Sequence, residues 1–243
     1  MTAQCVQSSV NAYWLMAVLS LMLVANAQSL EDAQGLFAVG KYLEASKMSA
    51  ALGSSAGFTF AAYTLGVHAG DQPKDQQEGL FVQCEQYARK ALELNKANAD
   101  AHAQLGVALG RLSGLRGAAY ALLNGVVGQV KGSFERALEL NPRQVIALIG
   151  LGRLHAELVS RGAGAMFGGD GALVKPLFER AVQADPKGIG VRLEYARALI
   201  VLDATANRAQ VRKLLESAAD LTPRDALERR QLKSVERLLA KLP

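Results

Sequence analysis

The amino-acid sequence predicts an all-α protein built from repeated pairs of helices. Three observations favour this class. Apolar residues recur at helical spacing along most of the chain, β-branched and aromatic residues are sparse, and similar segments return at intervals. Half of the 243 residues are hydrophobic, so the chain has enough apolar surface to fold around a core.

The repeats are visible as three segments that align with one another. They are ARKALELNKANADAHAQLGVALGR from Ala88, FERALELNPRQVIALIGLGRLHAE from Phe134 and FERAVQADPKGIGVRLEYARALIV from Phe178, and LLESAADLTPRDALERRQLKSVER from Leu214 matches more loosely. In each, an amphipathic helix ends at Asn-Lys, Asn-Pro, Asp-Pro or Thr-Pro. Proline cannot continue a helix, so we expect a turn there and a second helix directly after it.

The helical spacing and the turn residues give eleven expected segments. They are residues 30–39, 41–52, 57–69, 77–95, 98–113, 115–140, 143–161, 171–184, 188–202, 207–220 and 224–241. The segment 115–140 is unusual because it carries four glycines. Its small residues Ala118, Ala121, Gly125, Gly128 and Gly132 predict one close-packed face, either within the molecule or between copies of it.

Small and large residues at equivalent places predict how the helices pack. Gly106 and Gly152 are equivalent residues in the second helix of successive repeats, where a small side chain lets a neighbour approach closely. Phe134, Phe178 and Leu215 are expected to fill the space between helices. The first helices of the repeats offer small residues at Ala91, Ala137, Ala181 and Ala218.

These motifs resemble the tetratricopeptide repeat family. The carriers are Leu105-Gly106 and Leu151-Gly152, the A-x-x-x-F-x-x-A pattern, the terminal prolines, and GKYLEA at residues 40–45 as an inter-helix turn. The resemblance covers about residues 30–243. It implies one α-solenoid domain over residues 28–243, with about five helix pairs and a C-terminal capping helix. The general plan is also similar to the T-component of TRAP-type transporters.

An apolar run over residues 12–25 precedes Ala25-Asn26-Ala27, a small-x-small cleavage pattern. This predicts a signal peptide over residues 1–27 and an exported protein, periplasmic in a Gram-negative bacterium, with no stable membrane span after cleavage. The alternative is an uncleaved membrane anchor. Cleavage would leave Cys84 as the only cysteine, which we expect to be a packing residue.

The sequence offers no recognisable catalytic constellation, cofactor motif or metal-ligand spacing, so we expect a protein that is not an enzyme. The net charge of +5 is mild and does not favour nucleic acid. The Gly-rich segment 160–171 lacks the Lys-Ser/Thr pair and the preceding strand of a phosphate-binding loop. We expect a flexible loop there, with Met166 and Phe167 either packed inward or contacting a partner. The three histidines are expected to be structural.

The family resemblance implies a concave groove lined by the first helix of each family repeat, which is the helix that follows the turn in the segments aligned above. The groove positions carried over by alignment are Asp100, Ala103, Val107, Arg111, Ile146, Ile149, Arg153, Glu157, Leu193, Arg197 and Ile200. Arg153 and Arg197 are equivalent residues, which suits an acidic partner, although pairing of arginines with Glu157 and Glu194 is an equal alternative. Two functions remain open: a scaffold for a protein or peptide, and a component that binds a small apolar acid for a transporter.

Overall fold

The computed structural model describes residues 30–242, and within that range every regular element is helical. The all-α prediction is therefore confirmed for this part of the chain, whereas the predicted signal peptide lies outside the described residues. None of the described helices is long and apolar enough to cross a membrane. After a helix over residues 30–38, the elements are α2 Tyr42–Ala51, α3 Ser55–Ala69, α4 Lys74–Leu94, α5 Ala99–Arg116, α6 Ala118–Leu123, α7 Val126–Leu140, α8 Val145–Ser160, α9 Gly164–Phe167, a 3-10 turn Gly171–Leu173, α10 Val174–Ala184, α11 Ile189–Asp203, α12 Arg208–Ala219 and α13 Ala226–Leu239.

Several helices begin at a polar side chain that caps their first turn. The side chains of Ser54, Asn98, Gln144 and Asp225 accept hydrogen bonds from the backbone N–H three residues on. Such caps satisfy N–H groups that have no partner inside the helix. They account for starts close to those expected from the sequence.

The expected segment 115–140 is not one helix, and this prediction is wrong. Gly117 has a φ of 89° and ends α5, and Gly125 has a φ of 58° and separates α6 from α7. Glycine adopts these backbone conformations readily. Within the molecule the three glycines of the expected close-packed face are not packed: a Cβ built on Gly125, Gly128 or Gly132 would meet nothing within 4 Å.

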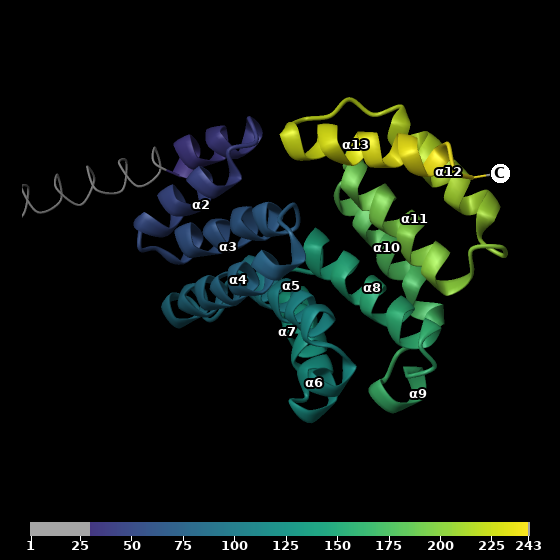
Figure 1. Ribbon diagram of the computed structural model, residues 1–243, viewed down its shortest axis with the longest axis horizontal. Helices are drawn as coiled ribbons and strands as arrows, with labels where there is room; N and C mark the ends of the chain where they lie inside the picture. Colours follow the sequence, from purple (N-terminus) through teal and green to yellow (C-terminus); the bar gives the residue numbers. More distant parts are fainter. Residues whose placement is uncertain (1–29, 243) are drawn as a thin grey trace, which may run out of the picture.

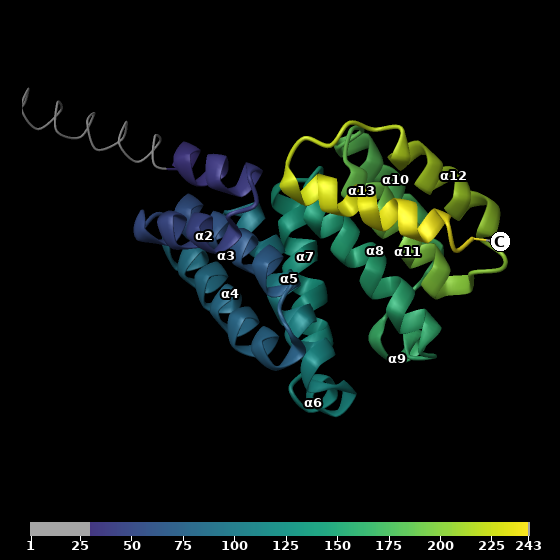
Figure 2. The ribbon, with the colours of Figure 1, turned by 45° about the horizontal axis from the view of Figure 1, so that its top comes forward.

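The helices follow one another in space in chain order (Figures 1 and 2). Each helix of the series α3, α4, α5, α7, α8 packs on the next, and α8 is followed by α10, α11, α12 and α13 in the same way. In addition α5 contacts α3 and α8, and α8 contacts α11. The arrangement is helical-repeat-like, with α3, α5, α8 and α11 as an inner row.

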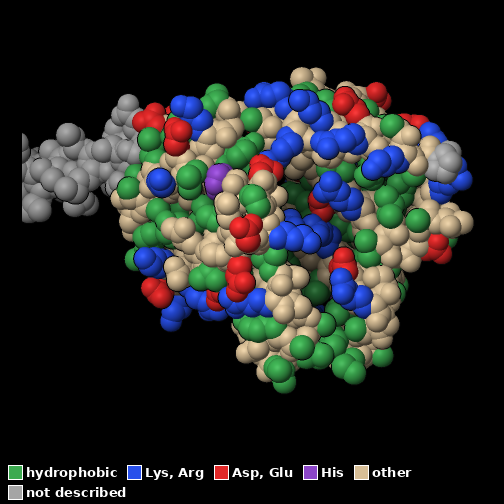
Figure 3. Space-filling model, in the orientation of Figure 1, with side chains coloured by type: hydrophobic (Ala, Val, Ile, Leu, Met, Phe, Trp, Pro, Cys, Tyr) green, Lys and Arg blue, Asp and Glu red, His purple; other side chains and the backbone are tan. Residues whose placement is uncertain are grey.

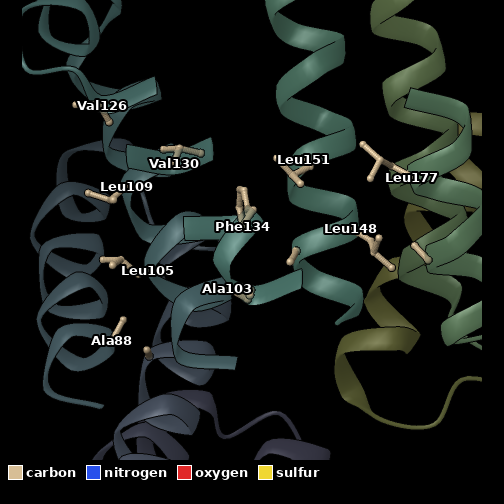
Figure 4. Packing of buried hydrophobic residues seen from close by; sticks show 14 of the residues in the cluster. Ala88, Ala103, Leu105, Leu109, Val126, Val130, Phe134, Leu148, Leu151 and Leu177 are labelled. Atoms are coloured by element: carbon tan, nitrogen blue, oxygen red, sulfur yellow. The ribbon is translucent and has the colours of Figure 1, made fainter. Parts of the chain in front are cut away.

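The core confirms the expected packing residues. Phe134 and Phe178 are buried, as are the four alanines expected to face them or their equivalents. Figure 4 shows Phe134 between Leu105 and Leu151, with Leu148 and Leu177 continuing the cluster. A Cβ on Gly106 would lie 2.7 Å from the ring of Phe134, and one on Gly152 would lie 2.6 Å from that of Phe178. A residue larger than glycine at either position would therefore clash with the neighbouring ring.

The last helix contacts the first ones. Ala226 and Leu227, at the start of α13, pack against an aromatic cluster that contains Phe37 and Tyr42. Arg230 forms an ion pair with Asp71. Figures 1 and 2 both show α13 reaching from the C-terminal helices toward α2 and α3. The two ends of the described chain are therefore in contact through α13.

The Gly-rich segment is a short structured excursion that contains α9. The expectation that Met166 packs inward is wrong, because 76% of its surface is exposed, whereas Phe167 is half-buried. His155 holds this segment in place: its Nδ1 accepts a hydrogen bond from the backbone N–H of Asp170 at 3.0 Å. Burial lowers the pKa of His155, and the nearby charge of Lys131 lowers it further. The buried imidazole is therefore neutral near pH 7.

Candidate functional site: an arginine-lined hollow

The expected groove residues all lie on three neighbouring helices of the inner row, α5, α8 and α11. Two of them do not line a surface, because Ala103 and Leu193 are fully buried. Four aliphatic ones are half-buried against the core, namely Val107, Ile146, Ile149 and Ile200. The polar members Asp100, Arg111, Arg153, Glu157 and Arg197 retain contact with solvent.

Arg153 and Arg197 converge on one carboxylate. Nη1 of Arg153 lies 2.8 Å from Oε2 of Glu194, and Nη1 of Arg197 lies 2.6 Å from Oε1 of the same residue. Glu157 instead pairs with Arg161, and Asp100 accepts a hydrogen bond from Gln144. Of the two alternatives left open by the sequence, the arginines therefore follow the one in which they pair with Glu194, and they share this single acid.

Arg111 is the third guanidinium of the group. It forms no ion pair or hydrogen bond with any residue in 30–242 beyond its helix backbone, yet it lies close enough to Arg153, Glu194 and Arg197 to interact with their charges. Desolvation by the surrounding protein lowers the pKa of Arg111, and the positive charge of Arg153 lowers it further. Because water still reaches Arg111, the guanidinium remains charged. Three arginines therefore lie close to one carboxylate, which leaves an excess of positive charge on this part of α5, α8 and α11.

The space-filling view shows one face of the molecule on which Lys and Arg side chains gather (Figure 3). A hollow opens between the two halves of the molecule, Lys and Arg side chains border it, and hydrophobic side chains are visible in its depth. Two shallow surface depressions of about 310 and 340 Å³ lie elsewhere, one lined by Pro142 and Arg180 and the other by His102 and Gln129. Neither is lined by an arginine of the hollow.

Other reactive side chains stand apart from this place. Cys84 is buried, as expected of a packing residue, and burial raises the pKa of its thiol to about 12. His102 contacts the carbonyl of Lys96 at 3.0 Å. Within residues 30–242 no three His, Cys, Asp or Glu side chains are grouped closely enough to hold a metal ion.

Over residues 30–242 the fold is that of a helical-repeat-like protein, and comparison with known families specifies the class further. Residues 24–163 match the family of regulator of microtubule dynamics proteins 1–3, and the chain belongs to this family. Curated protein sequences give no significant match.

The expected membership of the tetratricopeptide repeat family is therefore wrong, and so is the likeness to the T-component of TRAP-type transporters. The matched family spans the short helix α6 and nearly reaches α9. The tetratricopeptide pattern has no place for either of these two short helices. Small residues at helix crossings are not specific to the tetratricopeptide repeat family, because any closely packed pair of helices needs them.

Sequence reasoning missed two features of the hollow. It named Glu194 as a possible partner of the arginines but did not predict that Arg153 and Arg197 share it, although Glu194 and Arg197 are spaced three residues apart on one helix. It also did not single out Arg111 as the one arginine of the three without an acid. The residues next to Arg111 in the sequence do not indicate that it forms no ion pair, because this depends on how the helices pack together.

Proposed function

We propose that this chain is a non-catalytic binding protein that holds an acidic segment of a protein partner in the hollow lined by α5, α8 and α11. The observation that carries the proposal is the unbalanced cluster of Arg111, Arg153 and Arg197 around the single carboxylate of Glu194. A carboxylate-bearing segment would supply the missing negative charge and the acceptors that guanidinium groups bind bidentately.

The shape of the site favours a polypeptide over a small ligand. The hollow is open to solvent in Figure 3, whereas a small apolar acid is usually enclosed on most sides. Half-buried Val107, Ile146 and Ile149 offer apolar contacts beside the arginines, which suits a chain that alternates acidic and apolar residues. The family description also supports a protein partner, because a regulator of microtubule dynamics acts on a protein polymer.

We further propose that the helices form an α-solenoid of about five helix pairs, with α13 as the closing helix. The succession of contacts along the inner row α3, α5, α8, α11 supports this arrangement. A solenoid offers its partner an extended concave surface, which is the use most such proteins make of the fold.

Export also remains our proposal, motivated by the apolar run and Ala25-Asn26-Ala27. N-terminal sequencing of the protein recovered from its host tests it. A mature chain that begins at Gln28 supports export, and an intact Met1 in a membrane pellet contradicts it.

A binding titration tests the function. The probe is a fluorescent peptide of alternating Glu and Leu, followed by anisotropy at low and high salt. Replacing Arg153 and Arg197 together by Gln should lower its affinity by at least about tenfold, because charge-assisted hydrogen bonds contribute about 1.5–3 kcal/mol each. It should also weaken the salt dependence of binding.

The matched control is the double change of Arg136 and Arg143 to Gln. It removes the same charge from two exposed arginines outside the hollow. Equal affinities for the two double variants, with both still folded by circular dichroism, would contradict the proposal.

A further inference from the structure

The outer face of α13 carries a second set of basic side chains. Arg229, Lys233 and Arg237 are spaced four residues apart, so they form one stripe along the helix. All three are exposed. The apolar side chains of the same helix, such as Val235 and Leu232, face the other way and pack into the C-terminal core. We call these three residues the basic stripe.

The acidic residues in and next to α13 do not neutralise the basic stripe. Glu228 is buried, and its carboxylate is engaged by Arg224. The side chain of Asp225 caps α13 by accepting the backbone N–H of Glu228. The remaining acid of the helix, Glu236, forms no ion pair with any residue in 30–242. The sequence suggests a mixed, solvated face, but the folded chain presents unpaired cations there.

The helix that carries the basic stripe packs against one of the three helices that carry the arginine cluster. α13 packs on α11, which carries Glu194 and Arg197, and its first turns bridge to the N-terminal helices. Nη2 of Arg229 lies 3.4 Å from the carbonyl oxygen of Ala38 in the first described helix. Figure 3 views this face and shows Lys and Arg side chains both around the hollow and over the position of α13 in Figure 1.

We propose that the partner's acidic segment is extended and runs out of the hollow along the basic stripe of α13. This rests on the proposed function of the hollow and names the kind of partner: a polypeptide with acidic residues on both sides of the part held by the arginines. Arg229 and Arg237 are separated by about 12 Å of helix, a span that about four extended residues cover. A small acid held in the hollow does not reach that far.

A flat anionic membrane fits these observations less well. Figure 3 shows a hollow bordered by Lys and Arg side chains, and a flat bilayer cannot follow a hollowed surface. A helix that binds a membrane surface also turns apolar side chains outward beside its basic ones. On α13 no large apolar side chain is among those most exposed to solvent.

The test compares two acidic peptides on the full chain, one of about four glutamates and one of about sixteen. Replacing Lys233 and Arg237 together by Glu should lower affinity for the long peptide by about five- to thirtyfold and leave the short peptide almost unchanged. Arg111→Gln should weaken both peptides. The control is Lys47→Glu with Lys96→Glu, which makes the same change in net charge at two exposed lysines away from the stripe.

Each other outcome is decisive. If the stripe variant binds the long peptide as the control does, the extended path is wrong and the hollow proposal stands. If Arg111→Gln affects neither peptide, the hollow is not the site and the extended path falls with it. If the stripe variant loses only its sedimentation with vesicles containing anionic lipid, the stripe serves a membrane and the proposal is overturned.

Discussion

Replacing Gly150 by alanine perturbs the contact on which the packing of α7 against α8 depends. A Cβ at this position would lie 2.3 Å from Cζ of Phe134 and 2.6 Å from both Cε atoms. The ring of Phe134 cannot move away from the added methyl group, because the backbone of Gly106 in α5 already packs closely against it. A Cβ on Gly106 would lie 2.7 Å from the ring. Overpacking of this kind costs about 1–3 kcal/mol. The better helix propensity of alanine returns about 1 kcal/mol.

We therefore expect Gly150→Ala to lower the free energy of unfolding by up to about 2 kcal/mol, measured by urea unfolding followed by circular dichroism. The matched control is Gly132→Ala in α7, where an added Cβ meets nothing within 4 Å. That variant should be more stable than the parent by about 0.5–1 kcal/mol. The reasoning is refuted if the two substitutions change the free energy of unfolding in the same direction by the same amount.

The remaining predictions concern three buried side chains. Leu151→Asp should destabilise the chain by about 3–5 kcal/mol, because Leu151 is buried in the main cluster and an unpaired charge would replace it; unchanged thermal unfolding would show that another face of α8 is buried. Since the pKa of His155 is lowered on folding, its contribution to stability is complete above the ordinary histidine pKa of about 6.5 and is lost as the pH falls toward the lower folded value. Unfolding of the parent should thus become easier on acidification than that of His155→Gln, and the opposite order would contradict the burial of a neutral imidazole. In a Cys5→Ser background the Cys84 thiol, whose pKa is raised to about 12, should resist iodoacetamide until the chain is unfolded; rapid labelling of the folded protein would contradict its burial.

The positions of most helices could be predicted because each has its own local signal. The turns at Asn141-Pro142 and Asp185-Pro186 stop one helix, and polar caps such as Asn98 start the next. The small residues Gly106 and Gly152 mark close crossings because only two helices in contact require them. These are properties that neighbouring residues in the sequence determine.

The features that could not be predicted depend on residues far apart in the sequence. The glycines of α7 fit a close-packed face equally well, but no helix lies against Gly128 or Gly132. The sharing of Glu194 by Arg153 depends on the crossing of α8 and α11. The approach of α13 to Tyr42 and Phe37 depends on how every preceding helix is stacked. The spacing of apolar residues along a helix carries no information on the angles at which helices cross.

The proposed binding function is best tested with Arg111→Gln, because the proposal gives this arginine a role in binding while the described structure gives it no ion pair. Among the described residues it forms no ion pair, and its neighbours Arg153 and Arg197 disfavour its charge. A residue kept for binding at the expense of stability should show both effects in one variant.

The measurement is thermal unfolding and acidic-peptide affinity of Arg111→Gln, side by side with the parent. The account predicts equal or higher thermal stability together with an affinity at least about fivefold lower, since one charge-assisted hydrogen bond contributes about 1.5–3 kcal/mol and one exposed charge about 1 kcal/mol. Unchanged affinity, or a loss of stability with no change in affinity, would contradict it and make Arg111 a structural residue.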